Sequence, residues 1–123
     1  MKVTATDPGN FYHVVKSLYR DTQSRVRLGE GYTNWFSCST GVRQGDNLSP
    51  TLFALYINDL AVQVKNLNKG VQIDDYNLSI LLYADDIALI SSSEIGLQYS
   101  LDTVDSWCKK WRLQINPDKS KVL

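Results

Sequence analysis

Two adjacent aspartates, Asp85 and Asp86, are the residues of this sequence whose types and spacing point most directly to chemistry. They lie between two short, apolar, β-favouring runs, Leu78–Tyr83 and Ile87–Ile90. Neighbouring side chains of a strand point to opposite faces, so both carboxylates can reach one ion only if the chain turns there. Close carboxylates repel each other unless a proton or a cation lies between them, and their hard oxygens favour Mg²⁺ or Mn²⁺. We therefore predict a hairpin with an acidic tip, which either binds a divalent cation or is a solvated turn without an ion.

A second acidic pair, Asp74-Asp75, provides an internal comparison. It lies in the polar segment Asp74-Asp75-Tyr76-Asn77, which is typical of an ordinary solvent-facing turn. The apolar runs on both sides of Asp85 and Asp86 are what favour the metal-binding interpretation there.

The composition bounds the class of protein. The chain has 123 residues, 13 Lys or Arg, 13 Asp or Glu, and 43% hydrophobic residues. These values favour one folded core and exclude a disordered or strongly basic nucleic-acid-coating protein, but they leave room for a local basic groove. Cys38 and Cys108 form no zinc set with the single His, so we expect two free thiols. Without a signal peptide or a membrane span in the sequence, we expect an intracellular protein, in the nucleus or cytoplasm, that is not secreted.

The apolar pattern predicts an α+β chain. Helical spacing predicts helices over 11–19, from Ser49 and from about Glu94, with Ser49 capping the second helix. Strand-like runs predict a hairpin around Gly29-Glu30-Gly31 and the acidic hairpin, with both later helices packed on one sheet face. The same reasoning predicts a short strand at 113–115 and places the three tryptophans in the core (Trp35, Trp107 and Trp111).

Three segments carry a resemblance to a known family. Tyr83-Ala84-Asp85-Asp86 resembles the Tyr-x-Asp-Asp signature of reverse transcriptases. Upstream, the run Arg43–Pro50 is similar to the Arg-Gln-Gly-x-x-x-Ser-Pro block of that family, and downstream, Trp111–Lys121 is similar to its Asn-x-x-Lys segment. The order of these segments resembles the non-LTR (LINE-like) retrotransposon branch and covers about residues 10–123.

The resemblance implies a fold and a reaction. It implies that residues 1–123 form one partial palm domain of an RNA-directed DNA polymerase, with an antiparallel sheet and helices on one face. The intact enzyme would add dNTPs to a DNA primer 3′-hydroxyl on an RNA template, using two Mg²⁺ or Mn²⁺ ions. Asp85 would be a metal ligand, and Asp86 would coordinate the ion less directly or tune the charge beside it. Both residues would be catalytic. The remaining implied positions bind nucleotide or template: Arg43, Gln44, Gly45, Tyr83, Ala84 and Lys119.

Parts of the family pattern have no match in this sequence. The other metal-binding aspartate of the palm, the fingers and the thumb are absent, so we expect a fragment that is inactive alone and holds at most one weakly bound ion. An exposed sheet edge would then favour pairing with another chain. Two alternatives stay open: a non-catalytic palm module that binds nucleic acid or protein, and, with less support, an acidic metal-dependent hydrolase. No membrane partner is expected.

Overall fold

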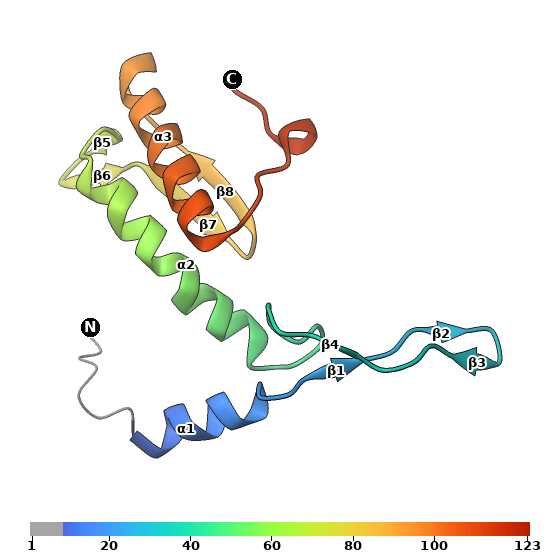
Figure 1. Ribbon diagram of the computed structural model, residues 1–123. Helices are drawn as coiled ribbons and strands as arrows, with labels where there is room; N and C mark the ends of the chain where they lie inside the picture. The colour runs from blue at the N-terminus through green and yellow to red at the C-terminus, as the bar shows by residue number, and fades with distance from the viewer. Residues whose placement is uncertain (1–8) are drawn as a thin grey trace. The chain divides into compact units, whose positions relative to one another are not determined.

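A computed structural model describes residues 9–123, which combine helices with small antiparallel sheets (Figure 1). The chain divides into two compact units, one ending at Arg43 and the other beginning at Gln44. Each unit is described separately below. In the described part of the chain, no helix is long and apolar enough to span a membrane.

The first unit consists of one helix and a long hairpin. Helix α1 (Gly9–Leu18) is followed by the antiparallel pairs β1 (Gln23–Ser24) with β4 (Phe36–Ser37) and β2 (Arg27–Leu28) with β3 (Gly31–Tyr32). The register places the two residues 25–26 opposite the three residues 33–35, which defines a β-bulge. The predicted hairpin around Gly29 is confirmed, and Gly29 has the positive φ (+57°) that its turn requires.

The second unit contains two long helices and two short hairpins. Its elements in chain order are α2 (Ser49–Asn66), β5 (Val71–Ile73), β6 (Tyr76–Leu78), β7 (Ile80–Tyr83), β8 (Asp86–Leu89), α3 (Glu94–Trp111) and the 3₁₀ turn η1 (Pro117–Lys119). Strand β5 pairs with β6 and strand β7 with β8, both antiparallel. Helix α2 contacts α3 and β7, and α3 contacts β8, so both helices pack against the β7–β8 hairpin.

One hydrophobic core joins α2, α3 and the β7–β8 hairpin. Trp107 is only 2% exposed, and its indole Nε1 donates a hydrogen bond to Asp59 Oδ2 at 3.2 Å. The Tyr56 ring lies 5.3 Å from both tryptophan rings of α3 and contacts each edge-on. The buried hydrophobic residues come from all three parts of this layer: Ile57, Leu60, Ala61, Val64, Ile80, Val104, Trp107 and Cys108.

The helix starts differ in how they are capped. The prediction that Ser49 caps α2 is wrong, because the N-cap position is Leu48 and no side chain there accepts a hydrogen bond. Asp46 orders this approach instead: its Oδ1 accepts from the Leu48 amide at 2.9 Å, and its carbonyl accepts from the Ser49 amide. At α3 the Ser93 hydroxyl accepts from the Gly96 amide at 3.1 Å, as expected of a capped start.

Three further expectations need correction. Residues 113–115 form no strand, since no neighbouring strand in the described chain offers them a ladder of hydrogen bonds. Trp35 is 59% exposed on the hairpin of the first unit and Trp111 is 42% exposed, so of the three tryptophans expected in the core only Trp107 is buried. The helix from about Glu94 was expected to pack its apolar face on the sheet, with Leu101 and Val104 on that face, but Leu101 is 37% exposed whereas Val104 is buried.

Candidate active site at the β7–β8 turn

The two candidate carboxylates lie at the closed end of the β7–β8 hairpin. The last residue pair is Tyr83 with Asp86, and the loop between them consists of Ala84 and Asp85 alone. Ala84 has φ 50°, in the left-handed region, where such a loop twists in the same sense as its two strands. Alanine adopts this conformation less readily than glycine, so the turn is locally strained.

The hairpin has one packed face and one open face. Residues directly opposite in an antiparallel pair share a face, and Ile80 and Leu82 lie toward the core together with Leu89, the partner of Ile80. Leu81 and Tyr83 lie on the other face and are 52% and 84% exposed. Asp86, as the partner of Tyr83, belongs to this open face. The turn therefore presents a tyrosine and a carboxylate side by side on the open face of the hairpin, while the other face packs against α2 and α3.

The donor chemistry of the turn suits a hard divalent cation. Asp85 and Asp86 are both exposed, and neither carboxylate has a hydrogen-bond or ion-pair partner among residues 9–123. Four carboxylate oxygens from adjacent residues fit Mg²⁺ or Mn²⁺ better than zinc. Within the same described residues, no group of three or more His, Cys, Asp or Glu side chains is clustered for metal binding. Asp85 and Asp86 thus fit as two ligands of a larger set.

The acidic turn between β5 and β6 shows what is particular to this site. Asp74 and Asp75 also form a two-residue loop, and Asp74 has φ 49°, almost the value at Ala84. In that turn both carboxylates belong to the loop. At the β7–β8 turn the acidic pair is shifted by one residue, so one carboxylate is in the loop and Asp86 begins the strand. The sequence predicted a polar turn over 74–77 and a turn between the apolar runs 78–83 and 87–90, whereas the structure limits each loop to two residues.

Arg43 has a structural environment that the sequence did not reveal. Its Nη2 donates to the Leu18 carbonyl and to Thr22 Oγ1, the latter at 3.3 Å, and its guanidinium lies 5.4 Å from the Tyr19 ring centroid. These contacts place a cation at the carboxyl end of α1, where the helix dipole favours positive charge. Its predicted contact with phosphate or template stays a prediction.

The other predicted nucleotide-binding residues lie in exposed loops of the second unit. Gln44 and Gly45 precede α2, and Gly45 has φ +85° with no atom within 4 Å of the position of a Cβ. Lys119 ends η1, where Asn116 Oδ1 accepts from the Lys119 amide at 3.4 Å. No hydrogen bond or ion pair joins these residues to Asp85 within the described part of the chain, so the structure brings together only Tyr83–Asp86.

One cluster was not singled out from the sequence. On the hairpin of the first unit, the guanidinium of Arg25 lies over the rings of Tyr32 and Trp35. The alternation of polar and apolar residues from Ser24 to Leu28, opposite an aromatic-rich strand, was the available signal.

Comparison with known proteins assigns the chain to a family. The family model described as reverse transcriptase (RNA-dependent DNA polymerase) matches residues 2–123. A probable RNA-directed DNA polymerase from transposon BS of Drosophila melanogaster is 35% identical over 97% of this chain. The RNA-directed DNA polymerase from mobile element jockey of the same species is 30% identical over 91% of the chain. A retrovirus-related Pol polyprotein from the type-1 retrotransposable element R2 of Nasonia vitripennis is 30% identical over 86% of this chain.

These relatives are far longer than the present chain, which spans 13%, 12% and 10% of their respective lengths. The match nevertheless extends over nearly every residue of the chain and includes all three motif segments. The chain therefore belongs to the reverse transcriptase family, in its non-LTR retrotransposon branch.

Proposed function

We propose that this chain is part of the palm domain of an RNA-directed DNA polymerase and that Asp85 and Asp86 hold its catalytic divalent cations. One observation carries the proposal. The Tyr83–Asp86 signature forms the tight end of an antiparallel hairpin whose opposite face is packed on α2 and α3. A rigidly supported turn of this kind keeps two carboxylates in place while one sheet face stays free for a primer and its template.

In the intact enzyme, Mg²⁺ or Mn²⁺ would assist attack of the primer 3′-hydroxyl on the dNTP α-phosphate by neutralising the developing charge. Asp85 and Asp86 would supply oxygen ligands from one side of that site. Tyr83, on the face of Asp86, would support the primer end, and the small side chain of Ala84 would leave room for it. Gly45 would let the backbone approach the nucleotide closely, because it has no Cβ.

Charge recognition of the nucleotide would fall to Gln44 and Lys119, together with Arg43 if its guanidinium also reaches a phosphate. The Lys119 backbone is fixed by the Asn116 side chain, so its ammonium group extends from an ordered turn. It could stabilise the triphosphate and donate a proton to the leaving pyrophosphate. The partners of the intact enzyme would be an RNA template, a DNA primer and dNTPs, in the nucleus or cytoplasm.

The 123-residue chain alone should not polymerise DNA. Asp85 and Asp86 belong to one turn and can supply only one side of a two-ion site, and no third carboxylate joins them among residues 9–123. Weak binding of a single Mn²⁺ remains compatible with this arrangement, since adjacent carboxylates still attract cations.

A chimera tests the proposal. Residues 2–123 replace the matching segment of the transposon BS polymerase, and extension of a DNA primer on an RNA template is measured with Mg²⁺. We expect template-dependent extension by the chimera. A chimera that is folded and binds the primer–template but incorporates no nucleotide would instead favour the non-catalytic palm module.

A further inference from the structure

We propose that the β1–β4 hairpin of the first unit binds single-stranded nucleic acid by stacking bases on Tyr32 and Trp35, with Arg25 holding the two rings in place. The assignment of nucleic acid as the ligand class rests partly on the proposed polymerase function. The site itself is separate from the β7–β8 turn and is defined by its own contacts.

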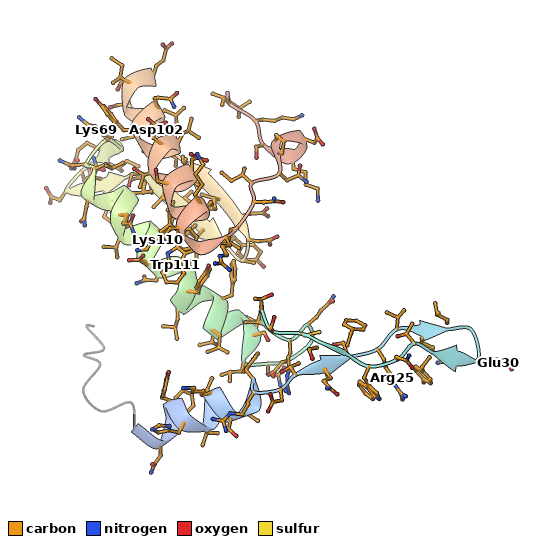
Figure 2. The ribbon with its side chains drawn as sticks, viewed as in Figure 1. Arg25, Glu30, Lys69, Asp102, Lys110 and Trp111 are labelled. Atoms are coloured by element: carbon orange, nitrogen blue, oxygen red, sulfur yellow. The ribbon has the colours of Figure 1, made fainter. Side chains whose placement is uncertain are left out.

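The geometry of the cluster depends on the β-bulge. Residues three apart in a regular strand point to opposite faces, so Tyr32 and Trp35 would normally diverge. The bulge adds one residue at 33–35, which returns Trp35 to the face of Tyr32. The Arg25 guanidinium on the opposite strand then lies 4.0 Å from the Tyr32 ring centroid and 4.7 Å from the Trp35 ring (Figure 2). Such cation–π contacts fix ring orientation in advance of binding.

The rings of this cluster are far more open than core aromatics. Tyr32 is 55% exposed and Trp35 is 59% exposed. No residue between 9 and 43 is buried, so the described part of this unit offers its aromatic side chains no hydrophobic core. Because Arg25 contacts both rings and their surfaces remain largely accessible, each ring retains area on which a planar base can stack.

The charge distribution favours a polyanion as the partner. Residues 1–43 carry six Lys or Arg and three Asp or Glu, which is an excess of basic residues. Residues 44–123 carry seven Lys or Arg and ten Asp or Glu, which is an excess of acidic residues. The hairpin itself holds Arg25 and Arg27, and neither forms an ion pair with a described residue. Its one acidic residue, Glu30, lies at the tip, away from the cluster (Figure 2). Basic charge combined with exposed aromatic rings is the arrangement that binds single strands without reading their sequence.

Single strands are favoured over duplexes by the same features. Stacking on a side chain requires an unpaired base with a free face, which a base inside a duplex lacks. Both RNA and DNA single strands offer this chemistry, and the cluster contains no feature that selects between them.

The test measures binding of labelled twelve-nucleotide oligo(U) RNA and oligo(dT) DNA to the purified 123-residue chain by fluorescence anisotropy. One stacked base corresponds to about a 5- to 150-fold change in affinity, so we expect Tyr32→Ala and Trp35→Ala each to weaken binding about tenfold. Tyr76→Ala is the matched control, because Tyr76 is 56% exposed on another hairpin, and it should change affinity less than twofold. The variants Tyr32→Phe and Trp35→Phe keep an aromatic ring and should retain most of the affinity.

Charge and stacking contribute separately, and salt distinguishes them. Arg27→Gln should lower the slope of log K against log salt by about 0.7, the value for one phosphate contact on a single strand. Trp35→Ala should lower affinity at every salt concentration without changing that slope. A blunt-ended duplex of the same length should bind more weakly than either single strand and should respond less to Trp35→Ala.

Three results would overturn the inference: equal single-strand affinity of the alanine variants and the parent chain, an equal loss with Tyr76→Ala, or equal losses for duplex and single strand. The first would show that bases do not stack on Tyr32 and Trp35. Single-strand binding is measured on the 123-residue chain with Trp35→Ala, whereas polymerase chemistry is measured by extension in the chimera with Asp85→Asn. Failure of the hairpin site and failure of the polymerase assignment are therefore distinguishable.

Discussion

At the scale of single residues, the Tyr-Ala-Asp-Asp signature has a conformational cost beside its proposed chemical role. Ala84 takes a left-handed conformation that glycine adopts freely, and the equivalent position of the β5–β6 turn holds Asp74, which tolerates it better. Glycine at residue 84 would relax the turn but would also loosen the backbone next to Asp85. The alanine is thus consistent with a turn that is kept stiff beside the two candidate metal-binding carboxylates.

Replacing Ala84 with glycine should therefore stabilise the fold. We expect Ala84→Gly to raise the free energy of unfolding by about 1 kcal/mol, because a non-glycine residue at positive φ is strained. Ala88→Gly is the matched control: the same change within β8, without positive φ, should lower stability by about 0.5–1 kcal/mol. Urea unfolding of the 123-residue chain measures both free energies. An Ala84→Gly variant that is less stable than the parent chain would contradict the inferred backbone strain at residue 84.

Cys108 gives a second prediction at this scale. Burial raises the pKa of its thiol, and the nearby Asp105 carboxylate raises it further. Because the unfolded thiol ionises at a lower pH, its contribution to stability is complete below pH 9 and is lost as the pH rises through the folded pKa. The free energy of unfolding should fall above pH 9, and Cys108→Ala should delay this fall until Tyr56, whose pKa is also raised by burial, begins to ionise above pH 10. A pH series of urea unfolding curves tests this, and an identical pH profile for parent and variant would refute it.

At the scale of elements, the β7–β8 turn is positioned by the packing of α2 on α3. The contact is centred on the last two turns of α3, where Trp107 and Trp111 lie against Tyr56 of α2. Trp107 is anchored by a hydrogen bond to Asp59, and the Tyr56 hydroxyl donates to the Trp111 carbonyl at 3.3 Å. The end of α3 is thereby fixed on the same layer that supports the hairpin.

The two tryptophans of α3 should differ in their contribution to stability. Trp107→Ala should lower the free energy of unfolding by about 3–5 kcal/mol, because it opens a cavity in the core and leaves Asp59 without its indole donor. Trp111 is 42% exposed, so Trp111→Ala should cost only about 1–2 kcal/mol. Thermal unfolding followed by far-UV circular dichroism checks the order, and equal losses would mean that the helix contact is centred elsewhere.

Sequence reasoning succeeded for elements whose pattern is local. Helix α3 was predicted from its apolar spacing and the Ser93 start, and the acidic hairpin from two β-favouring runs around Asp85. It failed where a neighbour decides the outcome: residues 113–115 have no strand to pair with, and Trp35 has no core beneath it. The positive φ of Ala84 depends on the register of β7 with β8, which the composition of the run does not reveal. The metal-binding role of the aspartates came from the family resemblance and stays a proposal.

At the scale of the whole molecule, the buried residues are confined to one unit. Every buried residue in the described chain lies between Ser49 and Cys108. Residues 9–43 form a ten-residue helix and a two-stranded hairpin, and isolated elements of this size are marginal in water. We expect a fragment of residues 44–123 to unfold cooperatively and a peptide of residues 9–43 to show no cooperative transition. Differential scanning calorimetry of the two fragments measures this, and a non-cooperative 44–123 fragment would contradict a self-sufficient core.

The assignment of Asp85 to polymerase chemistry is tested most directly by the extension rate of the chimera with the transposon BS polymerase. Asp75 is the matched control, because Asp75 and Asp85 are each the second residue of a two-residue hairpin loop. We predict that Asp85→Asn lowers the rate of nucleotide incorporation at least about 100-fold, since a metal ligand acts mainly in the transition state, while Asp75→Asn changes the rate less than twofold. Equal rates for the Asp85→Asn and Asp75→Asn chimeras would contradict the account.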